Sequence, residues 1–276
     1  YYFCTDLGSE EMVNRLSDGQ SDVAISVNWK YPISRSVLTA FDHGVLNAHA
    51  GDIPRYRGNA APNWAILNGE DEVVLTVHRM NKKIDAGPIV RQSQVPITEQ
   101  TYLGEVYEAM RTQFPELFVE SLSGLEDGTI TPQPQPDDPT TILRGYPRVP
   151  KDSEIDWKQS ATGIHRLVRA SAEPLFGAYT YLGTEKLIIW RARVENPAHQ
   201  YCGTPGQVAE RHPDSGEVSI ITGEGFLVLE EVQVENRDRT RATDVITSIR
   251  TRLGMDKQAE IRRLTEQIAE LTNRLD

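Results

Sequence analysis

Two polar side chains suited to catalysis, Asn47 and His49, stand two residues apart directly after a short apolar run. On extended backbone, side chains at this spacing point to the same side. A turn that contains Gly51, Pro54 and Gly58 follows, so we expect the pair where a strand runs out into a loop. Such strand ends carry the chemistry of α/β sheets. An Asn amide stabilises a developing oxyanion, and a neutral His accepts a proton near pH 7.

A carboxylate that completes this set is Asp85, in a second loop after another strand-like run. Asn47, His49 and Asp85 together supply an oxyanion donor, a proton acceptor and a group that orients the acceptor. An isolated Asn-x-His sequence is more often a turn Asn and a surface His, so the prediction depends on all three residues. His43 and His78 are conceivable metal ligands, but no ligand spacing supports a metal site, and we expect structural roles for them.

The composition is that of an ordinary globular protein, with 276 residues, 38% hydrophobic and 25% charged. The formal net charge of −11 repels polyanions and argues mildly against a nucleic-acid substrate. The only cysteines, Cys4 and Cys202, cannot build a metal cage or a disulfide framework, so a reduced, cytoplasmic location is expected. No apolar run approaches the ~18 residues that span a bilayer, so no membrane association is expected.

Helix and strand patterns alternate in the first half of the chain. Helices are expected at residues 10–16, 34–41, 60–67 and 101–125, and strands at residues 22–27, 44–46, 73–80 and 89–95. This alternation predicts a parallel or mixed α/β sheet.

The second half has a different rhythm. Prolines crowd residues 131–150, which predicts an extended linker or an ordered crossing segment. A helix is expected at residues 160–170, followed by short strands at residues 178–182, 187–194, 217–221 and 226–234 that suggest a small barrel. A short stripe of apolar residues at a and d positions ends the chain: Ile261, Leu264, Ile268, Leu271 and Leu275. This stripe fits either self-association or packing on its own domain.

These motifs resemble those of the formyltransferase family that uses 10-formyltetrahydrofolate, which includes methionyl-tRNA formyltransferase and the nucleotide-sugar N-formyltransferases. In the first half the resemblance rests on Asn47-Ala48-His49, residues 54–58 (Pro-Arg-Tyr-Arg-Gly), residues 65–69 (Ala-Ile-Leu-Asn-Gly) and Asp85-Ala86-Gly87. In the second half it rests on Ile155-Asp156-Trp157, Arg169-Ala170 and residues 203–206 (Gly-Thr-Pro-Gly). The similarity runs from about residue 22 to about residue 234.

The resemblance implies an α/β architecture in four parts. A Rossmann-like catalytic domain over residues 1–130 is followed by a proline-rich linker over 131–154, a β-rich, barrel-like domain over 155–240, and C-terminal helices with a short heptad stripe over 241–276. Family members begin with a βαβ unit that would precede Tyr1, so the sheet is expected to lack its first strands.

The resemblance also implies roles for individual residues. Asn47 would donate to the oxyanion of a tetrahedral intermediate, His49 would act as the base, and Asp85 would orient His49. The folate would be contacted, largely through backbone groups, by Met80, Asn81, Lys82, Ile84 and Gly87. The acceptor side of the site would contain Asp52, Pro54, Arg57, Gly58 and Trp64.

Several of these side chains have a second interpretation. A phosphate or the folate tail would be bound by four basic side chains: Arg55, Arg57, Lys82 and Lys83. Alternatively, the lysines form a solvated charged surface and Arg57 braces its own loop. Trp64 packs in the fold or, as a minority alternative, stacks on a substrate.

The expected function is transfer of a formyl group from 10-formyltetrahydrofolate, as co-substrate and without a metal, to a primary amine. The favoured acceptor is the amino group of a nucleotide-linked sugar in surface-glycan synthesis. In the tRNA enzymes the His is typically followed by Gly-Ser-Leu-Leu-Pro, whereas residues 50–54 here are Ala-Gly-Asp-Ile-Pro, which leans away from tRNA. The alternatives are methionyl-tRNA formyltransferase, hydrolysis of formyltetrahydrofolate, and a non-catalytic oligomerising scaffold. A homodimer is a further expectation from the C-terminal stripe.

Overall fold

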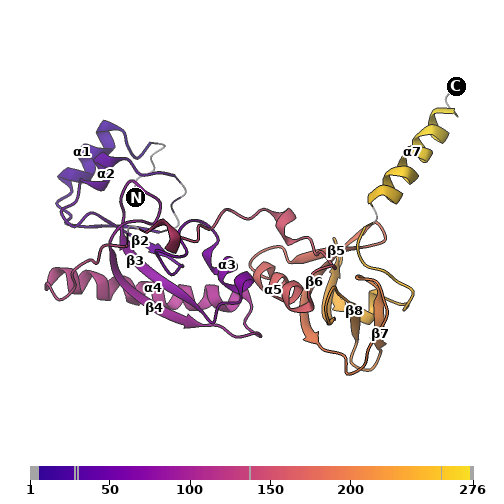
Figure 1. Cartoon of the computed structure of the whole chain (residues 1–276). Helices are drawn as coiled ribbons and strands as arrows, with labels where there is room; N and C mark the ends of the chain where they lie inside the picture. Colours follow the sequence, from indigo (N-terminus) through magenta and orange to yellow (C-terminus); the bar gives the residue numbers. More distant parts are fainter. Residues whose placement is uncertain (1–5, 28, 30, 137, 256, 274–276) are drawn as a thin grey trace. The chain divides into compact units, whose positions relative to one another are not determined.

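The chain divides into two compact units, Tyr1–Arg148 and Val149–Asp276 (Figure 1). The computed structural model describes residues 6–27, 29, 31–136, 138–255 and 257–273. Cys4 and Leu275 therefore lie outside the described residues. Among the described helices, none combines the length and the apolar character that crossing a membrane requires.

The first unit is built on a four-stranded sheet in the order β1-β2-β3-β4. Its strands are β1 (Ala24–Ser26), β2 (Val45–His49), β3 (Glu72–Arg79) and β4 (Ile89–Pro96). β1 is parallel to β2, whereas β3 is antiparallel to both β2 and β4. The mixed α/β sheet predicted from the sequence is thereby confirmed.

Four helices accompany this sheet, and three of them follow the sequence prediction closely: α1 (Glu10–Asp18), α3 (Ala61–Asn68) and α4 (Leu103–Glu126). α4 packs on β3 and β4, and α3 packs on β3 and on α4 (Figure 1). The prediction of a helix over residues 34–41 was wrong in length, because α2 covers only Arg35–Leu38. The chain turns beyond it, where Gly44 N donates to Phe41 O and the ring of Phe41 is buried.

The strand predicted at residues 44–46 is longer in the structure and includes the Asn/His pair. It runs from Val45 to His49, so Asn47 and His49 lie within β2 and not in the loop after it. The backbone of Asn47 is paired on both sides, with Ser26 of β1 and His78 of β3. Polar side chains in a central strand break the apolar pattern, which is why the pattern placed the strand end too early.

The proline-rich segment is hydrogen-bonded to the first unit. Gln133 bridges to Ile89, Gly145 bridges to Gly58, and Leu143 N donates to Arg55 O over 2.6 Å. The first unit consequently ends after Arg148, later than the residue 130 expected for the catalytic domain. Two 3₁₀ turns, η1 (Pro139–Thr141) and η2 (Pro150–Ser153), lie in this region.

The second unit contains a six-stranded antiparallel sheet in the order β5-β6-β9-β8-β7, with β10 paired to β9. Its strands are β5 (Ala178–Leu182), β6 (Glu185–Glu195), β7 (Val208–His212), β8 (Glu217–Ile221), β9 (Phe226–Val234) and β10 (Arg239–Arg241). β5 and β7 are the end strands of this order. Residues 252–253 bridge to both, because Leu253 pairs with Leu182 at the end of β5 and Arg252 pairs with Gln207 directly before β7. This is the kind of closure that a barrel-like sheet requires.

Helix α5 (Ala161–Ser171) packs on β5, β6 and β9 of the second unit, and the short α6 (Ala242–Val245) packs on β8, β9 and β10. Ser160 caps α5 by accepting from Gly163 N. Trp157 is buried and donates to Thr180 Oγ1 over 2.9 Å, which is a packing role. The C-terminal helix α7 (Lys257–Asn273) exposes Ile261, Leu264 and Ile268.

Candidate active site

One face of the sheet of the first unit carries four polar side chains at neighbouring positions. Asn47 and His49 alternate along β2, and their cross-strand partners on β3 are His78 and Thr76. Directly opposed residues of an antiparallel pair lie on the same face. The two strands thus place Asn47, His49, Thr76 and His78 together, although residues 47 and 78 are far apart in the sequence.

His49 is buried and has a fixed tautomer. Its Nε2 lies 2.5 Å from Tyr56 O, and a carbonyl oxygen only accepts, so Nε2 carries the proton in the neutral ring. The other nitrogen, Nδ1, then holds the free lone pair and lies 3.6 Å from Asp85 Oδ2. The Tyr56 carbonyl thus makes the hydrogen bond that fixes the tautomer, and Asp85 lies beside the other ring nitrogen.

The environment of His49 favours its neutral form. Burial lowers the pKa of His49 below its usual 6.5, and the nearby His78 acts in the same direction. The Asp85 carboxylate and the Tyr56 carbonyl oppose this by raising the pKa. A ring that is neutral at pH 7, with a carboxylate ready beside it, is suited to accept a proton.

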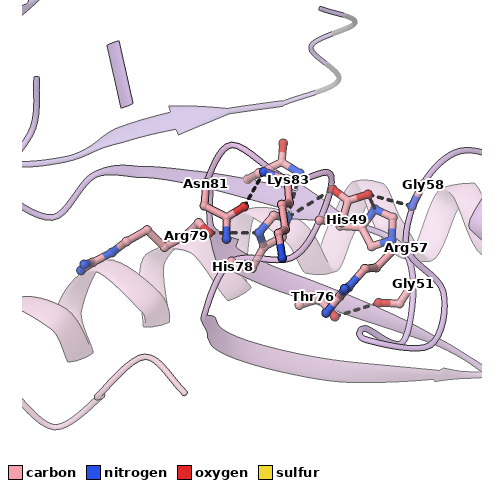
Figure 2. A network of polar contacts seen from close by, with 12 residues as sticks. His49, Gly51, Arg57, Gly58, Thr76, His78, Arg79, Asn81 and Lys83 are labelled. Atoms are coloured by element: carbon pink, nitrogen blue, oxygen red, sulfur yellow. Dashed lines mark hydrogen bonds and ion pairs between the residues drawn. The ribbon is translucent and has the colours of Figure 1, made fainter. Parts of the chain in front are cut away.

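Asp85 reaches the site from the loop between β3 and β4. Its Oδ2 accepts from Gly58 N over 2.8 Å, and its Oδ1 lies 3.5 Å from His78 Nε2. Figure 2 shows His49, His78 and Gly58 converging on this one point. The backbone of Asp85 has φ 46°, a left-handed conformation that is uncommon for a residue with a side chain.

The charge of Asp85 is stabilised by these neighbours. Burial by itself raises the pKa of Asp85, but the contacts with His78, His49 and the Gly58 amide outweigh burial and bring the pKa below its usual value. Asp85 is therefore ionised at neutral pH and provides a fixed negative charge between two imidazole rings.

His78 is a site residue that the sequence interpretation missed. Its Nδ1 lies 3.3 Å from Arg79 O, and its Nε2 lies 3.5 Å from Asp85 Oδ1. Nε2 also lies 3.3 Å from Nδ2 of Asn47, and in the tautomer with the proton on Nδ1 it accepts from the Asn47 amide and orients it. A signal for this was present: Thr76 and His78 are polar residues two apart, and they interrupt the apolar residues in the interior of β3.

The predicted folate-contacting residues lie in the β3–β4 loop. Met80 N donates to Val45 O, and the Asn81 side chain closes the loop by accepting from Lys83 N over 2.8 Å. Lys82 and Ile84 are exposed. Gly87 is buried, and a Cβ added there would lie 1.6 Å from the Arg79 carbonyl oxygen. Gly87 therefore lets the loop close against the end of β3.

Arg57 connects its own turn to this loop. Its Nε and Nη2 donate to Gln135 Oε1 over 3.0 and 2.6 Å. Gln135 Nε2 in turn donates to the carbonyl oxygens of Asp85 and Gly87. Gln135, which we did not predict, thus links Arg57 to both sides of Asp85.

The other predicted acceptor-side residues make separate contacts. Trp64 Nε1 donates to Tyr146 O over 3.0 Å, a packing contact with the proline-rich segment. Asp52 and Arg55 line a small hollow, and the pKa of Asp52 is raised mainly by burial. Pro54 is half-buried and follows a cis peptide bond. Within the described part of the chain, neither Asp52 nor Trp64 shares a hydrogen bond or ion pair with Asn47, His49 or Asp85.

Comparison with solved structures identifies proteins of the same fold. HypX from Aquifex aeolicus, in complex with tetrahydrofolic acid, is 21% identical with a TM-score of 0.61 over 87% of this chain and 41% of that chain. An N-formyltransferase from Helicobacter canadensis, in complex with folinic acid and dTDP-3-aminofucose, is 19% identical with a TM-score of 0.56 over 74% and 71%. WlaRD, a sugar 3N-formyl transferase solved in the presence of dTDP and 5-N-formyl-THF, is 20% identical with a TM-score of 0.55 over 78% and 73%. The chain thus spans about two fifths of the HypX chains that it matches.

Sequence models of a protein family match both units. Residues 4–122 match the formyl transferase model, and residues 149–250 match the model of the formyl transferase C-terminal domain. The first match contains β2, β3 and the loop with Asp85, and the second contains the antiparallel sheet. The chain therefore belongs to the formyl transferase family.

Proposed function

We propose that this chain transfers a formyl group from 10-formyltetrahydrofolate to the primary amine of a nucleotide-linked amino sugar. Family membership supports the reaction class. The names of two structural relatives, a sugar 3N-formyl transferase and an N-formyltransferase bound to dTDP-3-aminofucose, support the acceptor class.

The observation that carries the proposal is the arrangement of His49, Asn47 and Asp85 on neighbouring strands and one loop. Nδ1 of buried His49 has a free lone pair and lies 3.6 Å from the ionised carboxylate of Asp85. This nitrogen would accept the proton that an attacking amine loses, and Asp85 would stabilise the imidazolium that forms.

Asn47 supplies the second requirement of acyl transfer. Its Nδ2 has two hydrogens, and one of them is directed to His78 Nε2. The other is available for a carbonyl oxygen that gains negative charge during attack. The donor set of an oriented amide, a neutral imidazole and a carboxylate fits a folate co-substrate, whose contribution is an activated formyl carbonyl.

The test is a turnover assay with formyltetrahydrofolate and a panel of dTDP-, UDP- and GDP-linked amino sugars, with methionyl-tRNA as a competing acceptor. We expect formylation of at least one nucleotide sugar and little of methionyl-tRNA. His49→Ala should lower the rate by about 100-fold or more, because general base catalysis contributes on that order. His199→Ala, at an exposed position of the second unit, is the matched control.

Three results would contradict the proposal. Near-wild-type turnover in His49→Ala would remove the assigned base. Exclusive formylation of methionyl-tRNA would show that the acceptor is a tRNA and not a nucleotide sugar. Absence of any folate binding by calorimetry would favour the non-catalytic scaffold.

A further inference from the structure

An open hollow lies beside the β3–β4 loop and has an unusual charge. It contains about 540 Å³ of space free of protein atoms, including solvent at its open side. Three basic side chains, Arg57, Lys82 and Lys83, line it together with Asn81, Ala86 and Gln135. No carboxylate is among its lining residues. Arg57, Asn81 and Lys83 are labelled in Figure 2.

These three cations lack acidic partners. In the described part of the chain, none of them forms an ion pair, whereas Arg55 pairs with Glu70 and Arg91 pairs with Glu120. The chain has 40 acidic and 29 basic side chains, so acidic partners are abundant. Lys82 and Lys83 are also the only lysines among the described residues of the first unit. A cluster of unpaired positive charge in an acidic chain costs electrostatic energy that a bound anion would offset.

One of the cations is held in a fixed position. Gln135 accepts two hydrogen bonds from Arg57, through Nε and Nη2, so the guanidinium plane is oriented and Nη1 is left for a ligand. The same Gln135 donates to the carbonyl oxygens of Asp85 and Gly87. The wall of the hollow and the backbone that carries Asp85 are therefore parts of one hydrogen-bonded unit.

We infer that this hollow binds a polyanionic group with two or more negative charges, at one end of a substrate whose other end reaches Asp85. An oriented guanidinium with two exposed ammonium groups suits such a group, because Arg provides directed donors and Lys provides a point charge on a flexible stem. The inference rests on the proposed function and names a recognition element of the same site.

Two substrates of the proposed reaction carry this chemistry. One is the diphosphate of a nucleotide-linked sugar, and the other is the row of γ-linked glutamate carboxylates on a folate tail. Inorganic pyrophosphate and folate with one or three glutamates are probes that separate these sources.

The experiment is titration calorimetry of the purified protein with each probe at low ionic strength. The variant is Lys82→Gln/Lys83→Gln, and the matched control is Lys151→Gln/Lys158→Gln, which removes two exposed lysines from the second unit. We expect about tenfold weaker binding of one probe in the first variant and no change in the control, which corresponds to about 1.4 kcal/mol. Salt should weaken binding in the wild-type protein, because the Debye length falls from about 10 Å at 0.1 M to about 3 Å at 1 M.

The outcomes identify the source or overturn the inference. A loss confined to pyrophosphate assigns the hollow to the diphosphate of the acceptor, and a loss confined to the triglutamate assigns it to the folate tail. Equal binding of every probe by the wild-type protein and both variants overturns the inference. Since calorimetry needs no turnover, a protein that binds a probe through Lys82 and Lys83 but transfers no formyl group refutes the proposed function alone.

Steady-state kinetics separates a binding role of Lys82 and Lys83 from a purely structural one. In Lys82→Gln/Lys83→Gln, the KM of the substrate that carries the polyanion should rise by more than kcat falls. A fall in kcat with unchanged KM for both substrates would contradict the inference.

Discussion

At His49, the two ring nitrogens have different surroundings, and this difference defines the expected chemistry. Nε2 is committed to the Tyr56 carbonyl, while Nδ1 faces Asp85. Gly51 permits this arrangement, because a Cβ at that position would lie 2.5 Å from both His49 Nε2 and Tyr56 O. The sequence identified His49 and the glycine turn, but it could not identify which nitrogen is free, because that depends on a carbonyl seven residues away.

The lowered pKa of His49 gives the first prediction. Burial outweighs the influence of Asp85, so an NMR titration of the His49 ring should have its midpoint below pH 6.5. Asp85→Asn removes an influence that raises this pKa, so the midpoint should move to still lower pH. Transfer by this variant should also be slower by about 100-fold, because the imidazolium loses its counter-charge. A midpoint that moves upward in Asp85→Asn would contradict this account.

His78 gives the second prediction. His78→Gln replaces the ring nitrogen that contacts Asn47 with a rotatable amide, which holds Asn47 less firmly, so kcat should fall by about 10- to 100-fold while the fold, measured by circular dichroism, is retained. His199→Gln, with the same change at an exposed residue, is the control.

A double-mutant cycle shows whether His78 acts through Asn47. If it does, adding His78→Gln to Asn47→Ala should cost little more than Asn47→Ala alone. Fully additive losses would assign His78 an independent role.

At the scale of elements, the bounds of helices and strands with strong apolar periodicity could be predicted from the sequence, whereas strands rich in polar residues could not. The apolar alternation of β5, β8 and β9 gave their bounds from sequence, and the long amphipathic α4 was found within two residues at each end. β7 and β10 were missed because their sequences, Val-Ala-Glu-Arg-His and Arg-Thr-Arg, contain too few apolar residues to show alternation. These strands are stabilised by pairing with partners that are distant in the sequence, which a local pattern does not report.

Helix α5 gives the third prediction, which concerns stability. Burial, assisted by the positive charge of Arg169, lowers the pKa of His165 from 6.5 to about 4. Because the unfolded chain binds this proton more readily than the native one, stability is complete above pH 6.5 and decreases as the pH falls towards 4. His165 should account for a loss of about 3 kcal/mol across this range.

Urea unfolding of the wild-type protein and of His165→Leu at pH 7 and pH 4.5 measures this contribution. The variant should lose less stability on acidification than the wild-type protein does. Equal losses would show that His165 is not the group responsible.

For the whole molecule, charge organisation gives the fourth prediction. The net charge of −11 repels long polyanions, while the hollow beside Asp85 presents a small positive surface. We expect the polyanion that binds this hollow, pyrophosphate or folate triglutamate, to inhibit formyl transfer at physiological salt. Bulk tRNA at the same concentration of negative charges should have no effect. Inhibition by tRNA at a lower concentration of negative charges would contradict this expectation and would favour a tRNA acceptor.

The division of the chain into two units was partly visible in the sequence. In the sequence, alternating helices and strands change to short strands after the proline cluster, and the structure divides into two units at Arg148/Val149. Composition alone left open whether residues 131–150 were a free linker. Hydrogen bonds from Gly145 and Leu143 to the Arg57 and Arg55 carbonyls tie this segment to the first unit, and such long-range pairings have no local sequence signal.

The antiparallel pairing of β2 and β3 also has a consequence for how this protein tolerates changes in length. Side chains alternate along a strand, so deleting or inserting one residue between Val73 and Val77 would move Thr76 or His78 to the opposite face. Length variation within these strands would therefore dismantle the site even where the sheet survives. The loop from Met80 to Pro88 has no such parity constraint, so insertions that retain Asp85 and Gly87 are confined to it.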